Sequence, residues 1–334
     1  MSSVESLSRA RVSFAAQERY RLLFDDFAEC EAVATGALRW NADLPAVGDW
    51  VSARRVDPDL AIIEEVLPRR TVISRKHPGR NSGEQVIAAN VDTILLVMAL
   101  DRDFNLRRLE RYLVLSVASG ARPVVVLNKV DLCPDFAARI AEVESVAPDV
   151  TSIPLSALDS VGPLRVHIDG RTVVLLGSSG AGKSTIVNGL LGESHQSTQS
   201  VRESDSRGRH TTTSRMLFPL PGGGALIDTP GLRELALWAG EDSLDEAFSD
   251  IAAVAVGCRF NDCSHEAEPG CAIVEALASG AIPPDRWSSY LKLRAEVRYL
   301  ERTSDLTAGL AEKKRWKAIH KAMRRHPKYR LRTD

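Results

Sequence analysis

The stretch GSSGAGKST at Gly177–Thr185 follows the strand-like run TVVLL and precedes a run of helical character. A glycine-rich turn of this kind lies at the carboxyl end of a strand in a parallel sheet and leads into a helix. Its glycines let backbone N–H groups converge on phosphate oxygens, and the helix N-terminus adds a favourable dipole. The chain is therefore predicted to contain an α/β sheet with a phosphate-binding loop at its edge.

Two side chains of this loop have predicted roles beyond the backbone contacts. Lys183 is expected to neutralise the β and γ phosphates and to absorb charge during hydrolysis. Ser184 is expected to hold Mg²⁺ through its hydroxyl. The residues expected to surround the phosphates are Gly177, Ser178, Ser179, Gly180, Ala181, Gly182, Lys183, Ser184 and Thr185.

The stretch VVVLNKVDL at Val124–Leu132 carries a second signal, in which Asn128, Lys129 and Asp131 follow a strand-like run. Guanine presents N1–H and an exocyclic amine on one edge, and the Asp131 carboxylate can accept from both. Adenine would present a lone pair there instead. Lys129 can lay its aliphatic stem against the base. Beside a phosphate loop, this pattern predicts binding of GTP and GDP rather than ATP.

Two further stretches are predicted to complete the nucleotide site. In LSAL, the backbone N–H groups of Ser156 and Ala157 can donate to guanine O6, although an ordinary turn explains this stretch equally well in isolation. In LIDTPG, Asp228 can hold Mg²⁺ through water, and the Gly231 N–H can sense a γ phosphate. Both stretches follow strand-like runs, as residues at the edge of a parallel sheet would.

The polar stretch from Glu193 to Arg215 is too poor in apolar residues to form a core and is expected to be a mobile loop. Thr212 within it is expected to coordinate Mg²⁺ when GTP is bound, with Thr211 and Thr213 as neighbouring alternatives.

Leu232 follows the glycine of LIDTPG, where many GTPases have a glutamine that orients the attacking water. Leucine has no donor or acceptor and cannot do this. His210 is therefore the candidate to position the water, the alternative being an ordinary exposed loop histidine.

The order of these motifs is reversed relative to most GTPases, because the guanine motif precedes the phosphate loop by 49 residues. From Val91 to Gly177, strand-like and helical runs alternate, which predicts a parallel sheet with helices on both faces. Residues 81–239 are therefore predicted to form a circularly permuted P-loop GTPase domain.

Residues 1–80 are predicted to form an OB-like β-barrel with an N-terminal extension, because short strand-like runs separated by turns recur from about Arg21 to Lys76. A generic β domain is the alternative. Residues 1 to about 20 are expected to be frayed or helical, and Lys76–Gln85 is expected to be a linker. Trp40 and Trp50 interleave with basic residues, and each is expected to be a core residue rather than a stacking platform.

Residues 240–334 are predicted to form a helical zinc-binding domain. Three thiolates and one imidazole make a closed tetrahedral site with no open position, so one structural zinc ion is expected. Independent buried or redox thiols are the alternative. Two further cysteines, Cys30 and Cys133, are expected to be small core residues. The predicted ligands are Cys258, Cys263, His265 and Cys271.

The net charge of −1 gives no global attraction to nucleic acid, so such binding must come from local patches. One is the segment Lys313–Arg332, which has ten Lys or Arg and no acid and is expected to be a basic helix that binds RNA phosphates, with a solvated basic surface as the alternative. No apolar run is long enough to span a membrane, and the charged N-terminus is unlike a signal peptide, so a cytoplasmic protein with no membrane partner is expected.

The stretches PAVGDWV, AANVDTILLV, LNKVDL, GSSGAGKST, GRHTTT and DTPG occur in the order found in the ribosome small-subunit-dependent GTPase A family (RsgA/YjeQ), and the chain resembles that family over nearly its whole length. The resemblance implies a monomeric, Mg²⁺-dependent GTPase that binds the 30S subunit and 16S rRNA, is stimulated by the subunit and acts in its late maturation. It also implies that His210 acts in hydrolysis and that Thr212 binds the metal. The chain departs from the family between Ser156 and Gly177, where the short stretch VGPLRVHIDG indicates that the helix before the phosphate loop is shortened.

Two other functions fit parts of the sequence. A small-molecule kinase would use the phosphate loop but would explain neither Asp131 nor a rigid zinc module. A nucleotide-switched RNA-binding scaffold with little catalysis would be consistent with Leu232. Phosphate release measured with and without small subunits separates these possibilities from a subunit-stimulated GTPase.

Overall fold

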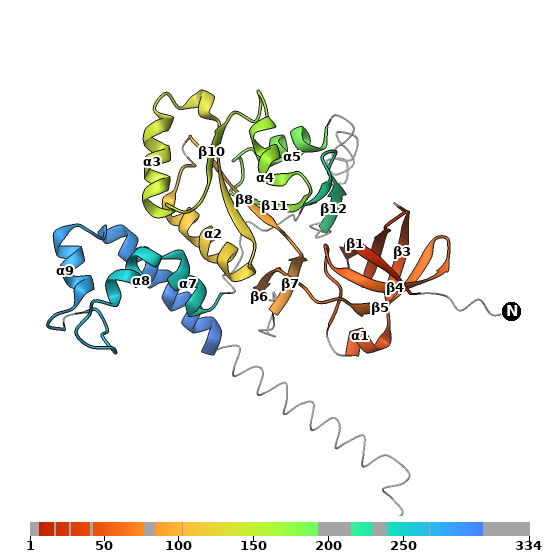
Figure 1. Ribbon diagram of the computed structural model, residues 1–334, viewed down its shortest axis with the longest axis horizontal. Coiled ribbons are helices and arrows are strands. Elements are labelled where there is room, and N and C mark those ends of the chain that lie inside the picture. Colours follow the sequence, from red (N-terminus) through yellow and green to blue (C-terminus); the bar gives the residue numbers. More distant parts are fainter. Residues whose placement is uncertain are drawn as a thin grey trace, which may run out of the picture.

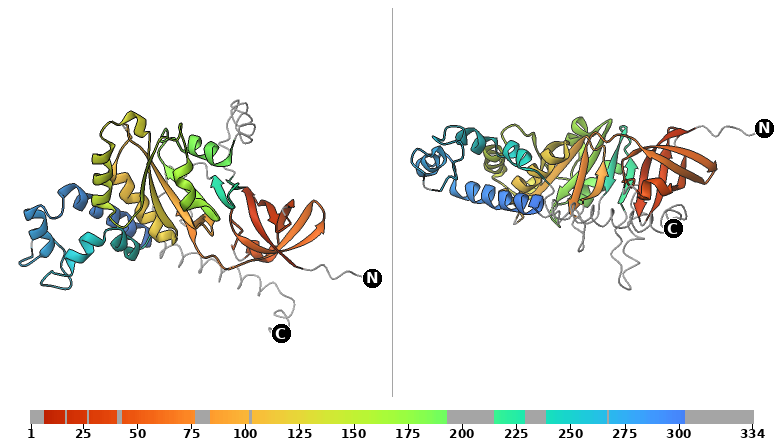
Figure 2. Two further views of the ribbon diagram at one scale, coloured as in Figure 1. Left: turned by 45° about the horizontal axis from the view of Figure 1, so that its top comes forward. Right: turned by 90° about the horizontal axis from the view of Figure 1, so that it is seen from below.

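The computed structural model describes residues 7–16, 18–26, 28–40, 43–76, 84–101, 103–192, 215–228, 239–266 and 268–302. A β-barrel, a central α/β sheet and a group of C-terminal helices follow one another along the chain and across the molecule (Figure 1). The further views in Figure 2 show the same succession, with the barrel and the C-terminal helices on opposite sides of the sheet. This architecture confirms the predicted fold class.

The barrel closes from five strands in the order β1-β2-β3-β5-β4-β1. The pairs are antiparallel except that β3 runs parallel to β5. Its interior is a separate apolar cluster that includes Val12, Leu22 and Ile63. The elements are β1 Ser8–Ala16, β2 Arg19–Phe24, β3 Glu29–Ala34, α1 Gly36–Trp40, β4 Trp50–Asp57 and β5 Leu60–Val66.

The expectation of a frayed or helical N-terminus is wrong, because β1 is a barrel strand that starts at Ser8. Ala10 and Val12 face the interior and are fully buried, whereas Arg9 and Arg11 on the other face bring their guanidinium groups over the Trp50 ring. The many polar residues hid this period-2 pattern. The expectation for Trp40 is also wrong, because this residue ends α1 with 80% of its surface exposed.

The segment expected to be a linker includes strand residues. Strands β6 Val72–Lys76 and β7 Glu84–Ala89 pair as an antiparallel two-stranded sheet between the barrel and the central sheet. Residues 77–83, and with them the expected domain boundary at residue 80, lie outside the described residues.

The central sheet has the order β10-β9-β8-β11-β13-β12, and all of its strands are parallel except β12. Strand β8 lies in the middle and is buried at every residue, as expected for a strand covered on both faces. Strands β12 and β13 pair as an antiparallel hairpin. The strands are β8 Thr93–Ala99, β9 Arg122–Asn128, β10 Ser152–Leu155, β11 Arg171–Gly177, β12 Arg215–Pro219 and β13 Gly224–Asp228.

Helices cover both faces of this sheet. One face carries α2 Leu106–Ser119 and α3 Phe136–Val146, and the other carries α4 Arg165–Ile168 and α5 Lys183–Leu191. Asn105 caps α2 by accepting from the Arg108 N–H. The helix before the phosphate loop is α4, and its four residues confirm the expected shortening.

Strand β1 joins the barrel to the central sheet, because it pairs with β12 through Phe14–Met216 and Ala15–Arg215. The two parts therefore share one eleven-stranded sheet. Arg11 reinforces the junction by donating to the Thr172 hydroxyl at 2.6 Å. Residues 193–214 of the predicted polar loop lie outside the described residues, and its last residue, Arg215, is the first residue of β12. The barrel is thus hydrogen-bonded to the strand that follows this loop.

The C-terminal region is helical, as expected, with α7 Glu241–Ala247, α8 Ser249–Ala255, α9 Ala272–Ser279 and a helix over residues 284–302. These helices share one apolar core with α2 and with one face of the sheet. A buried ionic network adds to this contact, since Arg286 binds Glu110 of α2 at 2.9 Å and Asp250 of α8 in bidentate fashion. Burial raises the pKa of Glu110, while the neighbouring Arg107 and Arg286 oppose that shift. No described helix is long and apolar enough to cross a membrane.

Candidate functional site

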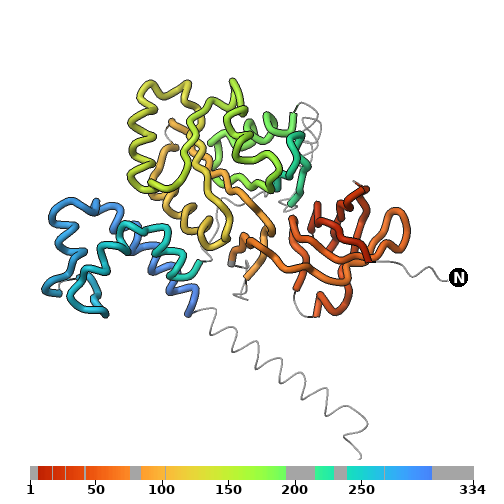
Figure 3. Tube along the Cα trace, viewed as in Figure 1, coloured from red at the N-terminus to blue at the C-terminus, as the bar shows by residue number. Residues whose placement is uncertain are grey.

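Five parallel strands end at one edge of the central sheet, and the predicted nucleotide motifs follow four of them. The guanine motif follows β9, the Ser-Ala turn follows β10, the phosphate loop follows β11, and Asp228 ends β13. Chain direction across the sheet reverses between β8 and β11, and ligands of open α/β sheets bind at such a reversal. Figure 3 shows the trace of residues 90–160 lying beside that of residues 170–192. Segments that are reversed along the sequence thus meet in space.

The phosphate loop has glycine where a side chain would collide. A Cβ at Gly177 would lie 2.4 Å from the Val97 carbonyl oxygen of β8. Gly182 has a φ of 94°, and a Cβ there would lie 2.1 Å from the Asn128 side-chain nitrogen. The two ends of the loop are therefore packed directly against β8 and against the guanine motif.

The Lys183 ammonium group lies over its own loop. Its Nζ donates to the Gly177 carbonyl at 2.7 Å and also to the Ser178 carbonyl. Lys183 is the first residue of α5, and Ser184, the next residue, is exposed. This places a cation and a hydroxyl beside the N-terminal N–H groups of a helix, which is an arrangement suited to phosphate.

Asn128 connects the two halves of the site. Its side chain is buried, donates to the Ala181 carbonyl at 2.9 Å and accepts from the Ala157 N–H at 2.9 Å. The Ala157 N–H, which was expected to donate to guanine O6, therefore has the Asn128 side chain as its partner in this structure. Ser156 beside it is 8% exposed. The guanine motif, the Ser-Ala turn and the phosphate loop are therefore joined through one amide.

Lys129 and Asp131 lie at the outer side of this edge. Lys129 adopts a φ of 64° and donates to the Asp101 carboxylate at 2.8 Å. The hydrogen bond from Lys129 holds the pKa of Asp101 below its usual value. Asp131 is exposed in the short 3₁₀ helix η1 Val130–Leu132. Its carboxylate is therefore open to a ligand.

Asp101 and Asp103 are contacts that the sequence analysis missed. They follow β8, and Asp103 accepts a hydrogen bond from the Ser178 hydroxyl of the phosphate loop. Arg108 of α2 in turn contacts the Asp103 carboxylate at 2.8 Å. Their position after a buried parallel strand is the signal that could have identified them, because such residues lie at the ligand-binding edge.

Three predicted residues of the site, His210, Thr212 and Gly231, lie outside the described residues, as does Leu232. Asp228 is described and half-buried at the end of β13. The structure therefore brings together the guanine motif, the Ser-Ala turn, the phosphate loop and Asp228 along one edge.

Because Asn128 bridges the Ser-Ala turn and the phosphate loop, its replacement by Ala and by Asp should have different effects on stability. Asn128→Ala should weaken nucleotide binding and lower stability by about 2 kcal/mol or more, because it leaves the Ala157 N–H and the Ala181 carbonyl unpaired. Asn128→Asp keeps the acceptor for the Ala157 N–H but replaces the donor to the Ala181 carbonyl with an oxygen. This variant should also bind nucleotide more weakly, but it should lose less stability than Asn128→Ala. Urea unfolding and a fluorescent-GDP titration measure the two effects, and unchanged binding in both variants would contradict the bridge.

The C-terminal region brings Cys258, Cys263, His265 and Cys271 together, with all four ligand atoms within 4.8 Å of one another. The Cys258 sulfur lies 4.0 Å from the Cys271 sulfur, and His265 Nδ1 lies 3.5 and 3.6 Å from these two sulfurs. A tetrahedral ion about 2.3 Å from sulfur and about 2.0 Å from nitrogen requires separations of roughly 3.5–3.8 Å. The cluster therefore fits a metal ion and could hold one.

Local structure explains how these ligands converge. Cys258 follows α8, and Cys271 caps the N-terminus of α9. The imidazole of His265 packs edge-on against Trp287, with ring centroids 6.0 Å apart. Burial lowers the pKa of His265, with Arg294 acting in the same direction, which favours the neutral ring that binds metals. The other two cysteines lie elsewhere, Cys30 in the barrel core and Cys133 packed against the central core.

The chain is similar to known proteins in sequence and in fold. The profile of a family described as RsgA GTPase matches residues 66–238. A protein named small ribosomal subunit biogenesis GTPase RsgA from Opitutus terrae is 49% identical over 313 residues, which are 89% of this chain and 85% of that protein. A protein of the same name from Leptospira interrogans serogroup Icterohaemorrhagiae serovar Lai is 42% identical over 331 residues, which are 97% of this chain and 92% of that protein. The crystal structure of YjeQ from Thermotoga maritima matches with a TM-score of 0.67 at 24% identity, covering 87% of this chain and 98% of that one, which supports the shared fold.

Proposed function

Because the chain belongs to the RsgA GTPase family, we propose that it hydrolyses GTP to GDP and phosphate in the biogenesis of the small ribosomal subunit. The observation that carries this proposal is the Asn128 amide, which ties the guanine motif and the Ser-Ala turn to the phosphate loop. One nucleotide can therefore contact all three. The relatives named above take their name from the subunit, and 16S rRNA is the proposed binding partner on it.

The chemistry of the site follows from its residues. In the bound state Lys183 leaves the carbonyls of its own loop and contacts the β and γ phosphates, while backbone N–H groups of Ser178 to Thr185 surround them. Asp131 accepts from guanine N1–H and from the exocyclic amine, and Ser156 and Ala157 face O6. Mg²⁺ that accompanies GTP neutralises phosphate charge, and Ser184 and Thr212 would hold it directly, with Asp228 acting through water.

Hydrolysis requires a group that orients water, and Leu232 cannot supply one. We assign this role to His210. His210→Ala should slow hydrolysis about 10²-fold with little change in GTP affinity, because general-base or water-positioning groups contribute about that much. Single-turnover phosphate release, with affinity measured separately by a fluorescent GTP analogue, checks this. Equal turnover of the variant and the unmodified protein would remove His210 from the mechanism.

The four-ligand cluster is proposed to hold one structural zinc ion, since its three sulfurs and one nitrogen suit that metal and leave no open position. The barrel, the zinc-bearing helices and the basic segment Lys313–Arg332 would then present a monomeric protein to ribosomal RNA in the cytoplasm. The proposed domains remain 1–80, 81–239 and 240–334.

Removing one ligand should release the metal. Cys263→Ser should reduce bound zinc from about one ion per chain to near zero and should increase hydrogen exchange across residues 258–279, because structural zinc contributes about 10 kcal/mol to folding such sites. The matched control is Cys133→Ser, which removes a thiol outside the cluster. Elemental analysis and exchange mass spectrometry give the readouts, and full zinc retention by Cys263→Ser would contradict the ligand set.

The function itself is tested by phosphate release from GTP with and without purified small subunits. Stimulation by the subunits supports a subunit-dependent GTPase. No turnover in either condition would favour a nucleotide-switched RNA-binding scaffold, the alternative that Leu232 keeps open.

A further inference from the structure

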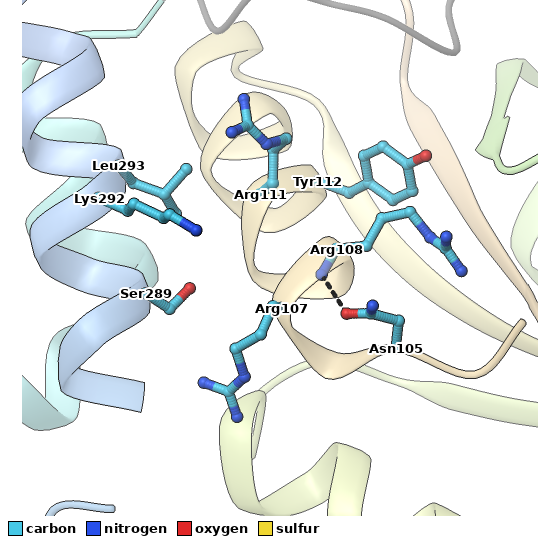
Figure 4. Close-up of a pocket in the computed structure, with 8 residues that line it drawn as sticks. All are labelled: Asn105, Arg107, Arg108, Arg111, Tyr112, Ser289, Lys292 and Leu293. Carbon is cyan, nitrogen blue, oxygen red and sulfur yellow. Dashed lines mark hydrogen bonds between the residues drawn. The ribbon is translucent and has the colours of Figure 1, made fainter. Parts of the chain in front are cut away.

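A pocket of about 390 Å³ lies between α2 and the helix over residues 284–302, where the central domain meets the metal-binding region (Figure 4). Its lining has four cationic side chains and no acidic one. Figure 4 shows Arg107 and Lys292 projecting into the gap between the two helices from opposite sides. The four cations of the lining are Arg107, Arg108, Arg111 and Lys292.

The carboxylates that pair with these cations lie outside the lining. Arg111 contacts Glu296 through two hydrogen bonds of 2.8 and 2.6 Å, and the Glu296 side chain is 41% exposed. Arg107 contacts Asp285, which is 71% exposed, at 3.2 Å and the buried Glu110 at 2.5 Å, and Arg108 contacts Asp103 at 2.8 Å. The exposed pairs with Glu296 and Asp285 contribute only about 0–1 kcal/mol, and a guanidinium has five N–H donors. Arg111 and Arg107 can therefore donate to a second anion at the positions that these two exposed carboxylates occupy.

Lys292 is the most available of the four cations. It is exposed, and no described residue pairs with its ammonium group. An exposed ammonium with no described carboxylate partner gains by binding an anion, because opposite charges attract. The pocket is therefore built for a negatively charged group.

The uncharged lining residues limit what that group can be. Tyr112 and Leu293 are both buried, 4% and 3% exposed, so neither offers an open face on which a nucleobase or an apolar side chain could stack. Guanidinium groups match the geometry of phosphate oxygens. The chemistry therefore favours a phosphate recognised through its oxygens alone, as in the backbone of a nucleic acid.

We propose that this pocket binds a backbone phosphate of RNA in the small ribosomal subunit. The proposal rests on the proposed function. It adds a specific contact at the junction of two domains, so that a single RNA strand would touch α2 and the metal-bearing helices together.

Lys292→Ala provides the test, since this side chain is exposed and its loss should not disturb folding. Binding of the full chain, loaded with a non-hydrolysable GTP analogue, to purified small subunits is measured at several salt concentrations. The variant should bind about 5–10-fold more weakly, and its slope of log affinity against log salt should be shallower by roughly 0.7–0.9, the value for one lost phosphate contact. The matched control is Arg165→Ala, a 46% exposed cation on α4.

The outcomes are distinguishable. If the unmodified protein binds subunits and Lys292→Ala behaves like Arg165→Ala, the pocket proposal is overturned while the proposed function stands. If the unmodified protein does not bind subunits, the pocket proposal and the proposed function are both overturned. A second measurement follows acetylation of the Lys292 amine by mass spectrometry. Subunits should protect it, whereas equal protection by millimolar inorganic phosphate would assign the pocket to a small phosphate ligand and overturn the RNA assignment.

Discussion

Lys183→Ala is expected to abolish tight GTP binding, with affinity falling about 10²–10⁴-fold. The ammonium group lies beside the N-terminus of α5, within reach of both terminal phosphates once it leaves the Gly177 and Ser178 carbonyls. Each charge-assisted hydrogen bond contributes about 1.5–3 kcal/mol, and two are lost together. Titration with a fluorescent GTP analogue measures the effect.

The control for this substitution is Lys292→Ala, which removes a lysine far along the chain from the phosphate loop. It should leave GTP affinity unchanged. Thermal unfolding of Lys183→Ala without nucleotide should stay close to that of the unmodified protein, because the two hydrogen bonds from Lys183 to Gly177 and Ser178 lie within one partly exposed loop. Tight GTP binding by the folded variant would exclude Lys183 from the phosphate site.

Asp131→Asn is expected to change which base the protein prefers. The carboxylate accepts from two donors of guanine, and an amide can accept only one and opposes the exocyclic amine with its own N–H group. GTP affinity should fall about 10²-fold. Xanthine carries a carbonyl in place of that amine, so xanthosine triphosphate should bind the variant more tightly than GTP does.

Competition binding of GTP, xanthosine triphosphate and ATP to Asp131→Asn and to the unmodified protein measures this change in base preference. Asp131 is exposed in η1, so the substitution should not alter folding. If discrimination between guanine and the other bases is unchanged in the variant, another group must read the base.

Much of the fold was predictable because its signals are local. The buried run of β8, the glycine that ends α2 and the glycine-rich turn after β11 each define an element within a few residues. The cysteine and histidine spacing likewise identified a cluster whose ligand atoms do converge. The predicted reversal of motif order is explained by parallel strands, which bring segments to one edge whatever their order along the chain.

The parts that were missed depend on distant partners. Strand β1 is polar on the face that carries Arg9 and Arg11, which obscures its alternating pattern, and its pairing with β12 spans about 200 residues, so no local signal predicts that pairing. Trp40 is exposed although tryptophan is usually buried. Asp103 belongs to no recognised motif. The parallel sheet brings the end of β8 beside the phosphate loop, and this places Asp103 against Ser178. Contacts of this kind arise from tertiary structure rather than from local propensity.

The central claim is that the guanine motif and the phosphate loop form one pocket despite their reversed order. A crystal structure with Mg²⁺ and a non-hydrolysable GTP analogue tests it directly. One nucleotide should have its phosphates against Lys183 Nζ and, at its other end, guanine N1 and the exocyclic amine about 2.6–3.2 Å from the Asp131 carboxylate. A nucleotide held at Lys183 whose base lies far from Asp131 would contradict the shared pocket.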